Sequence, residues 1–183
     1  MTTYNRERER HWFQIILLFV TSVAAFGTLL LHPPLHDYFN EFLPERFVLV
    51  NSIRHGIFPL WNPYQSMGTP THADPQSGAF YPLLWIFAIF GEYTSISCAF
   101  DFILHAFIAA CGFYTLTFRF TRHRWASFIT AAAYIMSGFF VGNAQHLSWI
   151  IAGAWLPWVL WACFSLFEEP DLKNALLTAV FAA

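Results

Sequence analysis

Charged side chains are scarce in this chain. Of its 183 residues only 11% are Asp, Glu, Lys or Arg, whereas an average soluble domain carries about 25%. Hydrophobic residues make up 57% of the sequence and aromatic residues 20%. A shortage of charge combined with long apolar runs excludes an ordinary soluble domain and predicts a protein embedded in a lipid bilayer.

Two further absences narrow the function. The formal net charge is −2, so the sequence lacks the basic field typical of proteins that bind nucleic acid, and we expect no nucleic-acid partner. The three cysteines, Cys98, Cys111 and Cys163, all lie within apolar segments. They show neither metal-ligand spacing nor a disulfide pattern, so we interpret them as small buried hydrophobic residues.

Hydropathy predicts an all-α polytopic membrane bundle with four full spans. A spanning helix needs about 20 apolar residues. The segments that fit are residues 12–31, 95–118, 126–141 and 149–167. Residues 174–183 are apolar but too short, and we interpret them as the truncated start of a fifth span in a longer parent chain. Residues 1–11 form a polar N-terminus, and residues 12–183 form the membrane domain. Gly138 and Gly142 make a G-x-x-x-G pair, which predicts close helix packing.

The positive charges set the expected orientation. With the N-terminus inside, the inner segments carry seven of the nine Lys and Arg residues, and the outer segments carry only Arg46 and Arg54. By the positive-inside rule the N-terminus is then cytoplasmic, and residues 32–94 form a long loop on the outer face.

The long outer loop at 32–94 is expected to be ordered, because it is too apolar for a disordered linker. Two of its segments predict interfacial helices. Residues 40–55 place apolar side chains on one broad face and Arg46 and Arg54 towards the other, as in a helix lying flat on a membrane. Residues 80–90 are apolar but too short to span, which favours an interfacial or re-entrant helix.

Asp37 is the main candidate for chemistry. It follows the first span by six residues, and a carboxylate at the membrane–water boundary can act as a general base or bind Mg²⁺ or Mn²⁺. The alternative is a solvated helix cap. Asp74 is either a turn former or a second carboxylate that contacts substrate. His146, on the outer turn between the third and fourth spans, can face the same cavity as Asp37.

Asp101 and His105 are a second kind of candidate, because they stand at positions i and i+4 inside the second span. An ionisable residue within a membrane segment is costly to bury and is a functional hypothesis by default. The alternative is a hydrogen bond from this helix to a loop or to another helix.

Several motifs resemble a known family in their identity and order. They are Asp37, Arg54-x-Gly56, PLWNPY at 59–64, Gly68-x-Pro70, Gln76, FYP at 80–82, His105, SGF at 137–139, His146 and AWLPW at 154–158. With these motifs the chain resembles the N-terminal part of the YfhO-type bacterial membrane proteins. Those proteins are related to the GT-C class of multi-span glycosyltransferases, which use polyprenyl-phosphate-linked sugars. The resemblance covers nearly the whole chain, and family members are several times longer.

The resemblance implies a multi-pass glycosyltransferase of the bacterial inner membrane that modifies a cell-envelope acceptor on the outer face. The resemblance also implies that Asp37 acts as the base or as a carboxylate that binds a metal ion. The implied partners are the lipid bilayer, a polyprenyl-phosphate sugar donor and the remainder of the parent chain. Arg46 or Arg54 would bind the donor phosphate, since a guanidinium matches phosphate geometry. The alternative for both is an arginine that lies along the membrane interface with its charged end in water. The predicted substrate-binding residues are Arg54, Trp61, Asn62, Tyr64, Asp74, Gln76 and His146.

No cofactor is implied other than a divalent cation, with Asp37 as its candidate ligand. Two alternative functions stay open. One is a transporter or flippase of a lipid-linked glycan, and the other is a non-catalytic membrane scaffold.

Overall fold

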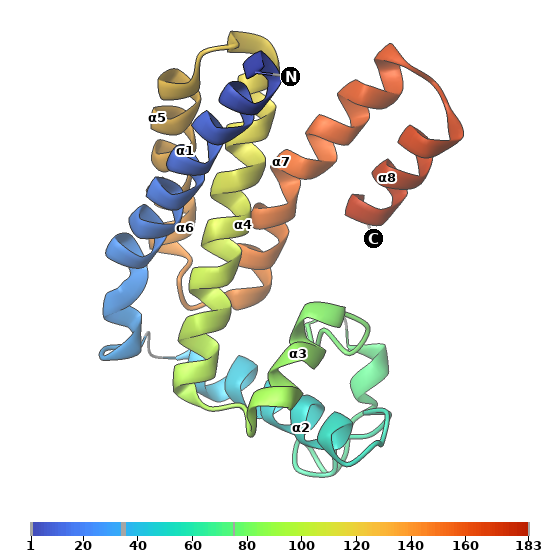
Figure 1. Cartoon of the computed structure of the whole chain (residues 1–183). Helices are drawn as coiled ribbons and strands as arrows, with labels where there is room; N and C mark the ends of the chain where they lie inside the picture. The colour runs from blue at the N-terminus through green and yellow to red at the C-terminus, as the bar shows by residue number, and fades with distance from the viewer. Residues whose placement is uncertain (1, 34–35, 75, 183) are drawn as a thin grey trace. The chain divides into compact units, whose positions relative to one another are not determined.

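The protein is all-α over the residues that the computed structural model describes, which are 2–33, 36–74 and 76–182 (Figure 1). Within these residues there is no strand, and Asn62 and Thr69 form an isolated antiparallel bridge. In chain order the helices are α1 (Thr2–Phe26), η1 (Gly27–Leu30), η2 (Tyr38–Phe42), α2 (Leu43–Arg54), η3 (Thr71–Ala73), α3 (Pro82–Phe90), α4 (Ser95–Thr121), α5 (Arg124–Ile135), α6 (Gly138–Gly142), α7 (Leu147–Glu168) and α8 (Leu172–Ala182).

Within the part of the chain that the structure describes, four helical stretches are long and apolar enough to cross a membrane. They are His11–Leu30, Ser95–Thr121, Arg124–Gly142 and Leu147–Glu168. These stretches coincide with the predicted spans to within a few residues at each end, so the all-α polytopic prediction is confirmed. The chain is therefore a multi-pass helical membrane protein. The apolar helix α8 has 11 residues and is too short to span.

The third span was predicted as a single uninterrupted segment, but its helix is broken near its C-terminal end. Helix α5 stops at Ile135, and α6 begins at Gly138. Ser137 between them has an extended backbone, with φ −65° and ψ 160°. An extended residue cannot continue the α-helical hydrogen-bond ladder, and this separates the last turn from the rest of the span.

Close helix approach occurs at Gly112 rather than at the predicted G-x-x-x-G pair. A Cβ atom at Gly112 of α4 would lie 2.6 Å from Nε1 of Trp158 on α7. This indole nitrogen donates a hydrogen bond to the carbonyl oxygen of Ile108 at 3.0 Å. A Cβ atom at Gly138 or Gly142 would meet no described atom within 4 Å. The prediction of tight packing at that pair is therefore wrong.

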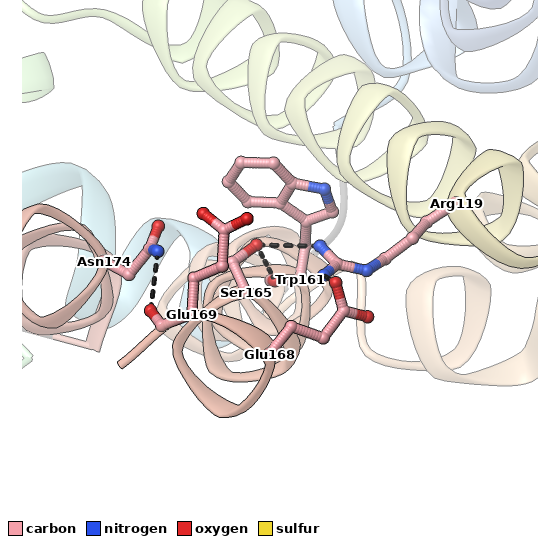
Figure 2. Close-up of polar contacts among 6 residues, drawn as sticks. All are labelled: Arg119, Trp161, Ser165, Glu168, Glu169 and Asn174. Atoms are coloured by element: carbon pink, nitrogen blue, oxygen red, sulfur yellow. Dashed lines mark hydrogen bonds and ion pairs between the residues drawn. The ribbon is translucent and has the colours of Figure 1, made fainter. Parts of the chain in front are cut away.

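A polar cluster joins the end of α4 to the end of α7 (Figure 2). The Arg119 guanidinium donates a hydrogen bond to Oγ of Ser165 at 2.7 Å and forms an ion pair with Glu168. Next to it, the amide of Asn174 at the start of α8 donates to the Glu169 carbonyl oxygen at 2.9 Å. Glu168 is largely exposed, so this ion pair contributes little stability, on the order of 0–1 kcal/mol.

The chain forms two compact units. Unit 1 comprises the described parts of Met1–Gly27, Phe102–Ala144 and Trp149–Ala183. Unit 2 comprises the described parts of Thr28–Asp101, together with Gln145–Ser148. Unit 1 holds most of the membrane spans. Unit 2 holds the long segment between α1 and α4, the first turns of α4 and the turn before α7. Asp37 and the predicted substrate-binding residues all lie in unit 2, whereas His105 lies in unit 1.

Helix α2 buries two charged residues in unit 2. Glu45 is 5% exposed and Arg46 is 1% exposed, whereas the apolar neighbour Phe47 is 37% exposed. The predicted polar face for Arg46 is therefore wrong. The physical reason is that the chain folds back over α2, and a Cβ atom at Gly78 would lie only 2.9 Å from Nη1 of Arg46.

Candidate functional site

The side chains of Asp37 and His146 meet in unit 2. The Oδ2 atom of Asp37 lies 3.0 Å from Nδ1 of His146. Their side chains are 44% and 26% exposed, so the pair is partly shielded yet open to solvent. The two residues are more than one hundred positions apart in the chain. Tertiary structure thus joins the predicted catalytic carboxylate to one of the predicted substrate-binding residues.

Buried neighbours hold both members of this pair in place. Tyr38 follows Asp37 and is fully buried, and its hydroxyl group donates to the carbonyl oxygen of Ser95 at 3.1 Å. Burial raises the pKa of Tyr38, which keeps the phenol protonated and able to donate. Leu147 follows His146 and is also fully buried, at the first residue of α7. Each functional side chain is therefore anchored by the residue next to it.

The Asp37 carboxylate does not cap the helix that it precedes. It stands at the N-cap position of η2, but its side chain makes no capping hydrogen bond. The carboxylate faces His146 instead. This geometry argues against the helix-cap alternative and leaves the carboxylate available for chemistry.

Gln145 extends the pair by one further group. Its Nε2 atom lies 3.2 Å from Nε2 of His146. When His146 is neutral and donates from Nδ1 to Asp37, its Nε2 atom accepts a hydrogen bond from the Gln145 amide. A second hydrogen bond of this kind fixes both the tautomer and the ring plane of the imidazole.

Three predicted substrate residues lie in a short hairpin closed by the Asn62–Thr69 bridge. Asn62 is buried, and its Oδ1 atom accepts a hydrogen bond from the Tyr64 backbone N–H at 3.0 Å. Tyr64 itself is strongly exposed. The indole of Trp61 covers Gly68, where a Cβ atom would lie 2.4 Å from Cζ2 of the ring. Asn62 thus shapes the hairpin, while Trp61 and Tyr64 present aromatic surface to the outside.

The other predicted substrate residues are exposed and lie elsewhere in unit 2. Arg54 is at the last residue of α2. Asp74 accepts a hydrogen bond from the Gln76 backbone N–H at 2.8 Å, which is the turn-forming role considered for it. These contacts are local. Among the described residues, no hydrogen bond or ion pair joins Asp37 to Arg54, Asp74 or Gln76. The hairpin, Arg54 and the Asp74 turn therefore remain predictions as parts of a common site.

The residues around Asp37 do not fit a Mg²⁺ or Mn²⁺ site. The pair supplies one carboxylate and one imidazole, whereas Mg²⁺ prefers a shell of oxygen ligands. Among the described residues, no group of three or more His, Cys, Asp or Glu side chains is arranged to hold a metal ion. We therefore derive no catalytic step through a cation.

Sequence reasoning missed the buried charges of α2, Glu45 and Arg46. The Glu-Arg doublet at 45–46, set among apolar residues of one helix, was the signal in the sequence that could have indicated a buried charge there. For Asp101 the structure shows the hydrogen bond to a loop that was the alternative considered for it. Tyr93, which precedes α4, donates its hydroxyl group to Oδ2 of Asp101 at 2.9 Å, and both residues are buried.

Comparison of the chain with protein-family models, with curated proteins and with solved structures found no match in any of the three. The resemblance to YfhO-type proteins therefore rests on the sequence motifs alone.

Proposed function

We propose that the chain is part of a GT-C-like membrane glycosyltransferase of the bacterial inner membrane. In this proposal the N-terminus is cytoplasmic, and sugar passes from a polyprenyl-phosphate donor to a hydroxyl group of a cell-envelope acceptor on the outer face. The observation that carries the proposal is the partly exposed Asp37–His146 pair. A positioned carboxylate of this kind is suited to act as a general base.

In the proposed reaction Asp37 accepts the proton of the acceptor hydroxyl group. The freed oxygen bonds to the anomeric carbon of the sugar, the bond from that carbon to the phosphate oxygen breaks, and the lipid phosphate leaves with the electron pair. His146 holds the carboxylate by donating from Nδ1 to Oδ2 and stabilises its charge before the proton arrives.

Phosphate binding falls to Arg54 in this proposal. Arg54 is exposed, whereas Arg46 is only 1% exposed and cannot reach a lipid headgroup in this conformation. The exposed indole of Trp61 and the exposed phenol of Tyr64 offer stacking surfaces for sugar rings.

The test is sugar transfer to envelope polymer by the full-length protein in cells that lack the native copy. Asp37→Asn keeps the shape of the side chain but removes the base, and we expect transfer to fall by about 100-fold or more at normal abundance. Glu41→Gln is the matched control, because it removes an exposed acidic group four residues away, and it should leave transfer unchanged. Normal transfer by Asp37→Asn would refute the proposal.

One observation favours the transporter alternative. Asp101 and His105 are both fully buried in α4, and transporters place ionisable groups inside the membrane. Asp101→Asn separates the two functions. If it abolishes glycan movement across the membrane while Asp37→Asn has no effect, the protein is a transporter. If neither variant changes either activity, the scaffold alternative holds.

A further inference from the structure

A cavity of about 440 Å³ lies between the C-terminal ends of α4 and α7. It belongs wholly to unit 1, and no residue of the proposed reaction lines it. Its volume is in the range of small-molecule sites, about 300–1,000 Å³. The charged side chains in its lining are those of Arg119, Arg122 and Glu168. Two guanidinium groups against one carboxylate give the cavity an excess of positive charge, which favours an anionic ligand.

The Arg119 guanidinium is held in place but is not fully paired (Figure 2). Its Nη1 atom donates to Oγ of Ser165 at 2.7 Å, and this hydroxyl group donates to the Trp161 carbonyl oxygen at 3.0 Å. Nη2 forms the ion pair with Glu168, whereas Nε is buried and has no hydrogen-bond partner among the described residues. A ligand with several oxygen atoms, such as a phosphate, can accept from both Nη2 and Nε.

Glu168 is the member of this cluster that can be exchanged. Its side chain is 67% exposed, whereas that of Arg119 is 16% exposed. Such an ion pair is weak, because water solvates an exposed carboxylate almost as well as its partner does. The Glu168 side chain can therefore turn into water and leave its position on Arg119 to another anion. The hydrogen bond to Ser165 keeps the guanidinium in place meanwhile.

Arg122 brings the second positive charge to the cavity from an unusual backbone conformation. It is the first residue after α4 and has φ +51°, a left-handed conformation that costs free energy in any residue other than glycine. Its backbone N–H donates to the Phe118 carbonyl oxygen at 3.0 Å and closes the last turn of α4. The side chain is exposed, and within the described part of the chain it forms no ion pair. Its charge is therefore available to a ligand.

Much of the remaining lining is aromatic and lies where two candidate membrane spans end. Phe118, Phe120 and Trp161 line the cavity, and Phe120 is 60% exposed. The two spans end at Thr121 and Glu168. Lipid headgroups lie at the ends of membrane spans, and tryptophan is typical of this level. The ligand that matches the lining is therefore an anion joined to hydrocarbon chains.

We propose that this cavity binds the phosphate group of an anionic phospholipid, which displaces Glu168 from Arg119. The phosphate oxygens accept hydrogen bonds from Nη2 and Nε of Arg119, and Arg122 supplies the second positive charge. The lipid chains leave the cavity past Phe118 and Phe120. Because the C-terminal ends of helices carry partial negative charge, binding of an anion here depends on the two arginines. The site is separate from the Asp37–His146 pair and does not rest on the proposed reaction.

Native mass spectrometry of the whole protein, released from detergent micelles, tests the arginine requirement. Dioctanoyl phosphatidylglycerol is the probe, and its titration gives the Kd of the first lipid bound. Arg122→Gln should raise this Kd by about tenfold or more, the value of a hydrogen bond to a charged group. Arg124→Gln is the matched control, because it removes the same charge two residues later and does not line the cavity. It should leave the Kd unchanged.

Glu168→Gln tests the displacement step. It removes the competing carboxylate and keeps the shape of the side chain, so the Kd should fall by about 2–5-fold. Glu169→Gln makes the same change of charge one residue later, outside the cavity lining, and should leave the Kd unchanged. Tighter binding cannot result from a damaged fold, so this comparison stays decisive if Arg122→Gln does not fold.

Two other probes identify the source of the phosphate. Dioctanoyl phosphatidylcholine carries a choline cation beside its phosphate and should bind more weakly, and an excess of inorganic phosphate should not displace the bound lipid. Equal losses of affinity in Arg122→Gln and Arg124→Gln, or an unchanged Kd in Glu168→Gln, would overturn the proposal. Equal binding of phosphatidylcholine, or displacement by inorganic phosphate, would also overturn it.

Discussion

The contact between Gly112 and Trp158 gives the sharpest prediction about stability. An alanine in place of a mid-helix glycine normally stabilises a helix by about 0.5–1 kcal/mol, because glycine loses more backbone entropy on folding. At Gly112 the added Cβ atom would lie 2.6 Å from Nε1 of Trp158. The indole must therefore move, and its hydrogen bond to the Ile108 carbonyl oxygen is strained or lost.

The magnitude follows from two costs that oppose the gain in helix propensity. Overpacking a well-filled contact costs about 1–3 kcal/mol, and a hydrogen bond between membrane helices contributes about 0.6 kcal/mol. These costs exceed the gain in helix propensity. Gly112→Ala should therefore lower the free energy of unfolding by about 1–3 kcal/mol relative to the wild type.

Gly138→Ala is the matched control, since a Cβ atom there meets no described atom within 4 Å. The assay is reversible unfolding by sodium dodecyl sulfate in mixed micelles, followed by circular dichroism. Adding Trp158→Phe to Gly112→Ala removes the crowded part of the ring, so the two substitutions together should cost less than the sum of their separate effects. Equal stability of Gly112→Ala and Gly138→Ala would refute the packing argument.

Three further substitutions test other contacts. Gly68→Ala should disorder the hairpin, because φ is +110° and a Cβ atom would lie 2.4 Å from the Trp61 ring, and limited proteolysis within the hairpin should become faster. Tyr93→Phe removes the donor to the buried Asp101 carboxyl oxygen, and unfolding in mixed micelles should be easier by about 1–3 kcal/mol, the cost of removing the donor from a buried acceptor. Glu168→Gln breaks the Arg119–Glu168 ion pair at its largely exposed member and leaves the Arg119–Ser165 hydrogen bond in place, so the same unfolding assay should detect a change of about 1 kcal/mol or less.

Local patterns in the sequence predicted much of the fold. Span positions follow from the length and polarity of continuous segments, and these properties do not depend on which helix packs against which. The predicted ends at 95 and 149 lie within two residues of the helix starts at Ser95 and Leu147. The break at Ser137 was not predicted, because residues 126–141 are apolar enough to be interpreted as a single span and backbone direction within such a run is set by packing.

The predicted topology put Asp37 and His146 on the same outer face, where they could share a cavity, but it did not predict that their side chains touch. Asp37 stood out because it is a carboxylate just past a span, and His146 because it is a polar residue on an outer turn. Nothing in the local sequence pairs them. Their contact at 3.0 Å depends on how Tyr38 and Leu147 are buried in unit 2.

The sequence by itself therefore determined the membrane class of this protein, the approximate position of its spans and the identity of its candidate acid–base residues. Only the tertiary structure decided that Asp37 meets His146, that Arg46 is buried under Gly78, and that close helix packing occurs at Gly112. The physical reason is that hydropathy and residue type are properties of short segments. Burial of one charge and the partner of another depend on contacts between segments that are distant in the chain.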